Sequence, residues 1–521
     1  MKYRIGIDVG GTNTDAVLMD LNDRVVEQTK EPTTSDVMLG IERAIATLLS
    51  GSGVKGSEIR QAMLGTTHCT NAIVERRNLN SVAHFRLALP ATGSIRPLRT
   101  MPEDLRAIFS EHVYVVPGGY DYDGSVLQSP DWEALRSTLE GLRDRVEAVS
   151  VCGVFSPVSG GQEEAFAALA REVLGADFPV SMSYQLGTIG LLERENAAIL
   201  NAALFRTARQ TANAFVEALK RHDVNANVYF GQNDGTLMTR SHALAFPILT
   251  IASGPTNSIR GASYLAKLEE ALVVDVGGTT TDVGVLSGGF PRESSLAVEI
   301  GGVRTNFRMP DIASIGLGGG TVVRVGADGN TVIGPDSVGY RLVEEALVFG
   351  GNTLTLTDIA VAKGLANIGR AENVAHLDRA LVDDVYDRYV AMVEQIIDRM
   401  KTSAEPMPVV LVGGGAILLP DTLKGAARII KPANFGVANA IGVAIAQASG
   451  EVELIVALDR KSLNAGIDEA TNQAIVRAIA AGARAATVKV VDVDTLPLAY
   501  LPGNATRIRV KAAGSLDSQA A

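Results

Sequence analysis

The chain has 521 residues and a net charge of −11 at pH 7, with 46% apolar and 20% charged residues. This composition is typical of a soluble globular protein with a large core, and the length predicts roughly two to four domains. The acidic balance argues against nucleic acid as an obligate partner, because a phosphate backbone is bound by a basic surface. Cys69 and Cys152 stand alone in the sequence, which excludes a disulfide framework and a Cys-ligated zinc or iron–sulfur site within one chain.

The sequence favours a cytoplasmic protein. Met1 is followed almost directly by a predicted strand, so no signal peptide is expected. The longest apolar run, at residues 435–448, is too short and too rich in small residues to span a bilayer. We therefore expect neither a membrane nor a nucleic acid among the partners.

The first predicted element is a hairpin with a Gly-Gly turn. Asp8 ends an apolar strand and Asp15 opens the next strand. The turn between them consists of Gly10, Gly11, Thr12, Asn13 and Thr14. Backbone N–H groups that turn inward at glycines, with hydroxyl groups beside them, suit phosphate oxygens. Carboxylates near phosphate make sense chiefly around a divalent cation, and the alternative is an ordinary hairpin with solvated aspartates.

Residues 23–29 are predicted to continue this sheet, and a helix over 37–49 is predicted to begin at a cap formed by Ser35 or Asp36. A strand at 62–64 then leads through a glycine turn into a helix that ends near residue 76. The turn holds three candidate substrate-binding residues, Thr67, His68 and Asn71. A helix N-terminus after such a turn suits an anion or a polar substrate. A plain Thr/Asn cap and a hydrogen-bonded loop histidine are the alternatives.

The next part of the first half alternates strands and helices. Residues 86–134 are predicted to be rich in loops, with a hairpin around Asp123 and Gly124. Helices at 132–145 and 159–174 alternate with strands at 148–154 and 180–183, which is the α/β pattern. A long Ala-rich helix from Glu193 to about residue 221 is predicted to connect two halves. Its charged first turn is predicted to be solvated, and the alternative, that it faces a cleft, makes Glu193 a substrate-side candidate.

The second half repeats the opening motif. A strand at 227–230 and a helix that begins at Ser253 and runs to 265 precede it. The second copy keeps the Asp-to-Asp spacing of the first and contains Asp275, Gly277, Gly278, Thr279, Thr280 and Asp282. Two copies at the same spacing favour two phosphate-binding loops, one from each half, that face each other.

Two further glycine clusters follow. Gly318, Gly319 and Gly320 precede a strand at 322–325, where either a bend or ligand contact is possible on the sequence alone. After a helix at 378–400, a strand at 408–412 ends in Gly413, Gly414 and Gly415. Bare backbone at such a turn lets a flat ring approach, as a nucleotide base and ribose require. From about residue 452, strands at 452–458, 488–493 and 506–510 around a helix at 468–486 predict a small appended α+β domain.

In this order, the two Asp-Gly-Gly motifs, the turn at 65–71, the helix start at 253–255 and the two glycine clusters resemble the hydantoinase A/5-oxoprolinase family. That family belongs to the actin, Hsp70 and sugar-kinase superfamily, and the resemblance covers roughly residues 3–450. It implies an α/β fold with two RNase H-like lobes around a nucleotide cleft, at residues 1–190 and 191–450, with the small C-terminal domain at 451–521. It also implies ATP and Mg²⁺ as cofactors, with Asp8 and Asp275 near the metal.

The resemblance further implies an ATP-dependent hydrolase that opens a cyclic amide such as a hydantoin, 5-oxoproline or a lactam. In this interpretation Asp275 or Asp282 orients the attacking group, the Thr residues of both loops bind phosphates, and Gly414 and Gly415 flank the nucleoside. Family members commonly act with a B-type subunit, so a protein partner and an oligomer are expected. A small-molecule kinase and an Hsp70-like reactivase of a partner enzyme are the alternatives. His68 and Cys69 depart from the small apolar residues expected in that turn, which puts the substrate in doubt.

Overall fold

The computed structural model describes residues 2–33, 37–294, 298–307, 309–326, 330–499 and 501–516, so the predicted cap at Ser35 or Asp36 lies outside the described residues. Nine strands form the first sheet, in which β1 (Tyr3–Val9) pairs antiparallel with β2 and parallel with β4. From one edge to the other the order is β3 (Val25–Pro32), β2 (Asn13–Asp20), β1, β4 (Ile59–Thr66), β9 (Asn227–Gly231), β10 (Leu237–Thr239), β21 (Ala448–Val456), β23 (Thr506–Gly514) and β22 (Lys489–Pro497).

The second sheet repeats the core of the first. Its central strand β11 (Ala271–Val276) pairs antiparallel with β12 and parallel with β19. The outer edge of β12 pairs with both β13 (Phe290–Pro291) and β16, and the order from β16 onward is β16 (Ile312–Ile315), β12 (Thr281–Ser287), β11, β19 (Met407–Val412) and β20 (Ala426–Ile430). The strands β3, β2, β1, β4 and β9 of the first sheet have this same order. The sequence repeat is therefore also a repeat of sheet topology.

A third sheet is inserted between β4 and β9. Its strands are all parallel, in the order β6 (Val113–Pro117), β5 (Val82–Leu89), β7 (Ala148–Gly153) and β8 (Val180–Met182). α4 (Trp132–Glu140) and α5 (Gly161–Leu174) cover one face, and the long helix α6 (Leu191–Arg221) packs against β7. The predicted α/β alternation is confirmed. The sheets, however, divide the chain differently from the ranges 1–190 and 191–450, because β9 and β10 return to the first sheet after the insertion.

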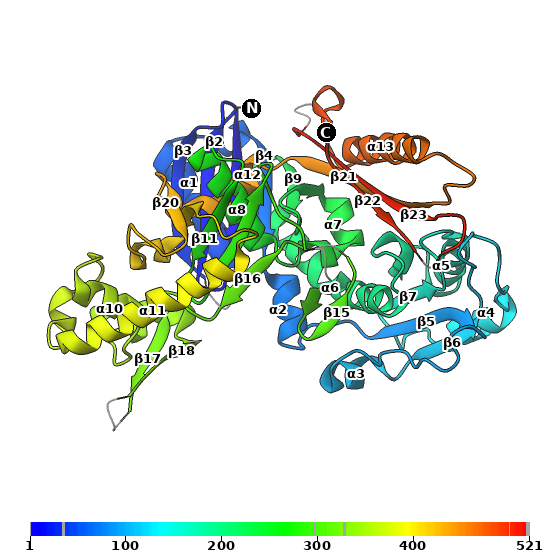
Figure 1. The fold of residues 1–521 in the computed structure, drawn as a ribbon, viewed down its shortest axis with the longest axis horizontal. Coiled ribbons are helices and arrows are strands. Elements are labelled where there is room, and N and C mark those ends of the chain that lie inside the picture. Colours follow the sequence, from blue (N-terminus) through cyan, green and yellow to red (C-terminus); the bar gives the residue numbers. More distant parts are fainter. Residues whose placement is uncertain are drawn as a thin grey trace.

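Two helices, α8 (Ser253–Ala266) and α12 (Ala438–Ile445), lie between the first and second sheets and pack against each other (Figure 1). α12 packs on β2 of the first sheet, and α8 packs on β11 and β19 of the second. A Cβ atom on Gly261 of α8 would lie 1.8 Å from the carbonyl oxygen of Ala438. A Cβ atom on Gly442 of α12 would lie 1.8 Å from the carbonyl oxygen of Asn257. Only glycine allows this approach, so the two sheets are held at a close helix crossing.

The sequence predicted a separate C-terminal domain, and this was wrong: the C-terminal strands extend the first sheet. β21 joins β10 at a single residue pair, Leu237 and Ala448, and β23 and β22 follow. α13 (Leu463–Ala480) covers one face of these strands and packs its alanines against β21 and β23. In Figure 1 this red and orange extension reaches out on the side where the third sheet lies. The predicted division at residue 450 therefore falls inside a strand.

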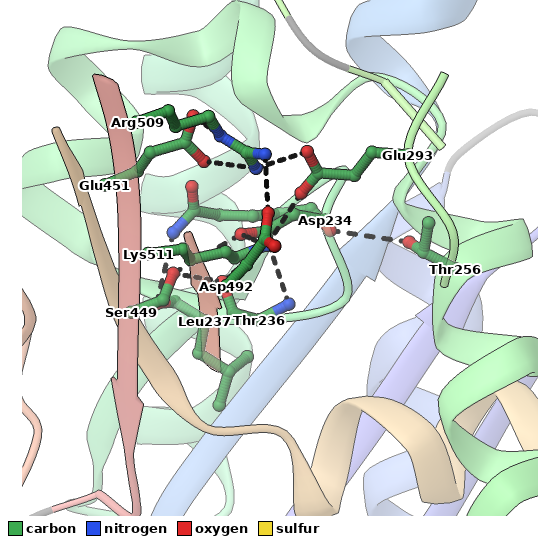
Figure 2. Close-up of polar contacts among 11 residues, drawn as sticks. Asp234, Thr236, Leu237, Thr256, Glu293, Ser449, Glu451, Asp492, Arg509 and Lys511 are labelled. Atoms are coloured by element: carbon green, nitrogen blue, oxygen red, sulfur yellow. Dashed lines mark hydrogen bonds and ion pairs between the residues drawn. The ribbon is translucent and has the colours of Figure 1, made fainter. Parts of the chain in front are cut away.

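A buried cluster of charges strengthens that junction (Figure 2). Lys511 of β23 pairs with Asp234 at 2.8 Å and with Glu293 at 3.0 Å. Arg509, with a side chain 1% exposed, pairs with the same Glu293, with Glu451 at 2.6 Å and with Asp492 of β22 at 2.8 Å. Asp234 lies in the β9–β10 turn of the first sheet, whereas Glu293 follows β13 of the second. The cluster therefore connects the C-terminal strands to both sheets.

A second buried ionic group fixes α6 to the third sheet. Glu195 accepts hydrogen bonds from Arg86 at 2.5 and 2.7 Å and lies 2.6 Å from His84 Nε2. Although burial alone would raise it, the contacts with His84 and Arg86 lower the pKa of Glu195 to about 2. The neighbouring Arg194 and Asn196 are also buried. The prediction that this first turn is solvated was therefore wrong for residues 194–196, which pack inward as part of the core.

The other α-helices of the described residues are α1 (Val37–Ser52), α2 (His68–Val74), α3 (Glu103–Phe109), α7 (Arg240–Ala245), α9 (Leu342–Glu345), α10 (Leu356–Lys363) and α11 (Arg379–Met400). Two small hairpins, β14 (Val298–Ile300) with β15 (Val303–Thr305) and β17 (Thr321–Val325) with β18 (Thr331–Ser337), complete the strands. Within the described ranges, no helix combines the length and apolarity that crossing a membrane requires.

Candidate functional site

The two Asp-Gly-Gly motifs form matching hairpins, one between β1 and β2 and the other between β11 and β12. In the first, Asp8 and Asp15 are directly opposite each other across β1 and β2, and the Gly10 N–H donates to the Asn13 carbonyl at 3.0 Å. The second hairpin pairs Asp275 with Asp282 across β11 and β12, with a corresponding 2.9 Å bond from Gly277 N–H. The shared Asp-to-Asp spacing is therefore the spacing of partners across a four-residue turn, which places both carboxylates on one face of each sheet.

The turns of the two hairpins touch each other. A Cβ atom on Gly278 would lie 2.6 Å from Oγ1 of Thr12, so the second turn requires glycine because the first turn fills the space beside it. Nothing lies within 4 Å of the position that a Cβ atom would take on Gly11, so this glycine faces open space. None of the turn glycines has a positive φ. Close packing against Thr12 therefore explains Gly278, and Gly11 faces open space, so neither glycine is required by a left-handed backbone.

Both turns line one cleft of about 330 Å³. The cleft is also lined by the N-terminal end of α8 and by the glycine turn after β19. The sequence-predicted residues that the structure brings together there are Asp8, Gly10, Gly11, Thr12, Asn13, Thr67, Asp275, Gly277, Gly278, Thr279, Thr280, Asp282, Gly319, Gly413, Gly414 and Gly415. Elements from both halves of the chain thus meet at a single concave site, which is the usual setting for a small ligand.

The glycine turn after β19 packs directly behind the second hairpin. Gly413 has φ +84°, and a Cβ atom there would lie 2.1 Å from Oδ1 of Asp275. The segment before β17 supports the same hairpin from another side, because the Gly319 N–H donates to the Gly277 carbonyl at 3.0 Å. Gly318 is packed against this backbone and does not line the cleft.

The carboxylates of the cleft are costly to ionise in the protein alone. Burial raises the pKa of Asp8 to about 6, although amide hydrogen bonds of 3.0 Å from Asn257 and Asn439 act in the opposite direction. Burial also raises the pKa of Asp275 to about 7, against a 2.5 Å hydrogen bond from Ser258. Removal of water is the main cause in both cases. A cation in the cleft would therefore be favoured by both groups.

The predicted metal pair fits Mg²⁺ only in part. The described residues contain no group of three or more His, Cys, Asp or Glu side chains placed to hold a metal ion. Asp8 and Asp275 alone leave most of an octahedral shell to phosphate oxygens and water, which is how Mg²⁺ is commonly bound beside nucleotides. Both oxygens of Asp8 already accept an amide hydrogen bond, which suits contact through metal-bound water.

Several predicted residues lie away from the cleft. Thr14 is fully buried and points toward Gly40 of α1. His68 contacts the hydroxyl of Thr66, and burial lowers its pKa, which favours the neutral imidazole. Asn71 is exposed on α2. Glu193 lies beside Gly190 at the start of α6. Of the substrate-side candidates, only Thr67 lines the cleft.

The sequence interpretation missed several polar residues at the site, among them Lys30, Asn257, Ser258, Thr357 and Asn439. Lys30 lines the cleft and pairs with Asp15 at 2.5 Å. Asn257 and Ser258 belong to the first turns of α8, and the hydroxyl-rich start of that helix was their only sequence signal. Asn439 of α12 donates both to Asp8 and, at 2.8 Å, to Asp15, so it joins the two carboxylates of the first hairpin. Apolar side chains also close one wall of the cleft, those of Leu342, Ile368, Ile417 and Leu418.

Comparison with known families is consistent with this site. Residues 4–174 match the hydantoinase/oxoprolinase N-terminal region, and residues 194–369 match the hydantoinase/oxoprolinase domain. The chain belongs to the hydantoinase/oxoprolinase family. These two regions contain both Asp-Gly-Gly turns with their aspartates, the strands β5, β6 and β7 of the third sheet, and the N-terminal end of α8.

Curated members of the hydantoinase/oxoprolinase family are similar to the chain at low identity. The acetophenone carboxylase gamma subunit of Aromatoleum aromaticum is 28% identical over 397 residues, which cover 70% of this chain and 53% of the relative. The caprolactamase alpha subunit of Pseudomonas jessenii is 24% identical over 385 residues, covering 70% of this chain and 54% of the relative. The chain thus matches about half the length of these relatives.

A solved member of the family shares the fold. The crystal structure of the ATP-dependent caprolactamase from Pseudomonas jessenii superimposes with a TM-score of 0.77 at 18% identity, and covers 99% of this chain and 88% of that one. The match spans almost the whole chain, so the mixed α/β fold is shared with that structure.

Proposed function

We propose that the chain is an ATP-dependent subunit that activates the carbonyl group of a cyclic amide, so that the ring can be opened by hydrolysis. The observation that carries this proposal is the meeting of two like-built glycine hairpins across one cleft, with Thr12 packed directly against Gly278. Two sets of backbone N–H groups and hydroxyls on opposite sides of one space suit a chain of phosphates. The name of the caprolactamase relative supports an amide as the substrate.

Each wall of the cleft has a role in this proposal. Thr12, Thr279 and Thr280 bind phosphate oxygens, and Gly11 leaves room for them. The turn at 413–415, together with the apolar wall that includes Leu342 and Ile417, receives the nucleoside. Mg²⁺ held by Asp8 and Asp275, directly or through water, would neutralise the charge that develops on the phosphates. The two sheets then act as RNase H-like lobes of the actin and Hsp70 type, with the site between them.

The chemistry needs little more from the protein than positioning. The amide oxygen attacks the terminal phosphorus and ADP leaves, which makes the ring carbon attackable. Water then adds to that carbon, and the ring nitrogen takes up a proton as the C–N bond breaks, which leaves an acyl phosphate. A second water hydrolyses the acyl phosphate to the carboxylate and releases inorganic phosphate. In this proposal Asp282 or Asp275 orients the attacking group. Burial raises the pKa of both carboxyls, that of Asp275 to about 7.

The carboxylase relatives favour a second candidate, activation of a ketone carbonyl for carboxylation. The same phosphate-binding cleft serves both reactions, so the acceptor molecule decides between them. The relatives are named as subunits, which supports a protein partner for this chain in either case.

The test measures ADP and phosphate release with ATP and Mg²⁺, in the presence of hydantoin, 5-oxoproline, caprolactam, or a ketone with bicarbonate. Each assay is run with the chain alone and with the product of a neighbouring gene added. Amide-dependent ADP release together with ring-opened product is the expected result. A stable phosphorylated hydroxyl compound would identify a kinase instead. ATP turnover that depends only on a partner protein would identify a reactivase, and no nucleotide binding would refute the proposal.

A further inference from the structure

The cleft contains one basic residue among many acidic ones. Asp8, Asp15, Asp275 and Asp282 all line it, and among the described residues of its lining Lys30 is the single Lys, Arg or His. A bound triphosphate adds several more negative charges to this space. Whether Lys30 only neutralises Asp15 or also contacts the ligand is therefore decisive for how the site holds phosphate.

Lys30 is positioned by a row of residues that crosses three strands. Asp8 is opposite Asp15 across β1 and β2, and Asp15 is opposite Lys30 across β2 and β3. Residues directly opposite in adjacent antiparallel strands point to the same face of the sheet, so all three side chains point to the cleft. The ammonium group lies 2.5 Å from Oδ1 of Asp15, while Asn439 holds the other oxygen at 2.8 Å.

The same ammonium group reaches the opposite wall of the cleft. The position of a Cβ atom on Gly414 lies 3.8 Å from Lys30 Nζ, although Gly414 belongs to the second sheet and Lys30 to the first. About a third of the Lys30 side chain remains accessible, whereas Asp15 is almost fully buried. The ammonium group thus forms an ion pair with Asp15 on one side and remains partly accessible on the other.

We propose that Lys30 is a phosphate-binding residue of the nucleotide site, held in place by Asp15 and contacting a phosphate group from the first sheet while the glycine turn at 413–415 closes from the second. Lysine binds phosphate as a compact point charge on a flexible chain, which suits a position anchored at one side only. A bound phosphate group would then be contacted from both sheets, by Lys30 of the first and by the glycine turn that follows β19 of the second. The inference rests on the proposed function, because it requires a nucleotide in the cleft.

The test is the affinity of the full chain for ATP, ADP, AMP and adenosine, each with Mg²⁺, measured by calorimetry for the unsubstituted protein and for Lys30→Met. Loss of a charged contact is expected to weaken ATP binding by about tenfold or more and to leave adenosine binding within about twofold. Lys30→Arg should restore part of the ATP affinity. It should also restore part of the dependence of affinity on salt concentration, which Lys30→Met reduces.

Lys363→Met is the matched control, because Lys363 makes an ion pair of similar geometry, 2.7 Å to Asp383, outside the cleft. It should leave all four affinities unchanged. Circular dichroism and thermal unfolding establish that each variant is folded. ATP affinity of Lys30→Met equal to that of the unsubstituted protein would overturn this inference and leave the proposed function standing. A parallel loss for ATP and adenosine would likewise overturn it. No nucleotide binding by the unsubstituted chain would overturn both.

Discussion

The contact between the two hairpins makes a sharp prediction about two equivalent glycines. Gly11 and Gly278 occupy the same position in the two copies of the motif, yet their surroundings differ. A methyl group on Gly278 would lie 2.6 Å from Oγ1, 2.8 Å from Cγ2 and 2.9 Å from Cβ of Thr12, whereas a methyl group on Gly11 would meet nothing within 4 Å. Contacts under 3 Å to side-chain carbon cannot be kept, so Gly278→Ala must push the turns apart.

The magnitude follows from the general cost of overpacking. Inserting a methyl group into a filled site costs about 1–3 kcal/mol of unfolding free energy. The change concerns only the contact between the turns, because Gly278 has no positive φ that alanine would strain. Gly278→Ala should therefore lower stability by about 1–3 kcal/mol. Gly11→Ala should leave stability within about 0.5 kcal/mol while weakening nucleotide binding, since its methyl group occupies ligand space.

Urea unfolding of four proteins tests this prediction: the unsubstituted chain, Gly278→Ala, Thr12→Gly and the double variant. Thr12→Gly removes all three atoms that the new methyl group meets. The double variant should therefore be more stable than the sum of the single changes implies, with a coupling of about 1 kcal/mol or more. Equal stability of Gly278→Ala and Gly11→Ala, or the absence of coupling to Thr12, would show that the two hairpins do not rest against each other.

Three further predictions concern buried ionisable groups. Asp275→Asn should abolish ATP turnover without loss of stability. Burial raises the pKa of Asp275 from 3.8 to about 7, so the folded state holds this proton more tightly than the unfolded state does. The free energy of unfolding of the ligand-free protein should therefore fall as the pH rises from about 4 to about 7, and urea unfolding should show a smaller fall in the variant. Arg86→Met should cost about 3–5 kcal/mol, because it removes the Arg partner of the buried Glu195. A loss under about 1 kcal/mol, as expected for exposed Arg324→Met, would contradict this. Burial raises the pKa of Cys69 to about 11, so a thiol reagent at pH 8 should modify it only after unfolding, and rapid labelling of the native protein would contradict the packing of α2.

The sequence was sufficient to predict the hairpins because all their determinants are local. Asp8 and Asp15 are separated by one turn, and strand pairing follows from the apolar runs on either side. The match between the two copies then implied a shared cleft. Thr14 was misplaced by the same local pattern, because alternation along β2 turns every second side chain away from the cleft.

Contacts between distant segments could not be predicted in this way. Asn439 reaches Asp8 from 431 residues away, and nothing near Asn439 distinguishes it from a residue at the end of any helix. Lys30 depended on the register between β2 and β3, which a single sequence does not fix. Membership of β21 in the first sheet rests on one pair of residues and on the charges of Lys511 and Arg509, so the tail resembled an independent unit. The inward packing of Glu195 required its partners His84 and Arg86 to be known.

The charge cluster around Glu293 has a consequence for movement of the two sheets. Glu293 follows a strand of the second sheet, while both of its cations belong to the extension of the first. A rotation that separated the sheets at this corner would strand Arg509 and Lys511 without a shared carboxylate in a poorly hydrated interior, which is energetically expensive. Any rotation of the two sheets relative to each other is therefore expected to keep this corner intact. Such a rotation would pivot at this corner and would widen the cleft at the glycine turns.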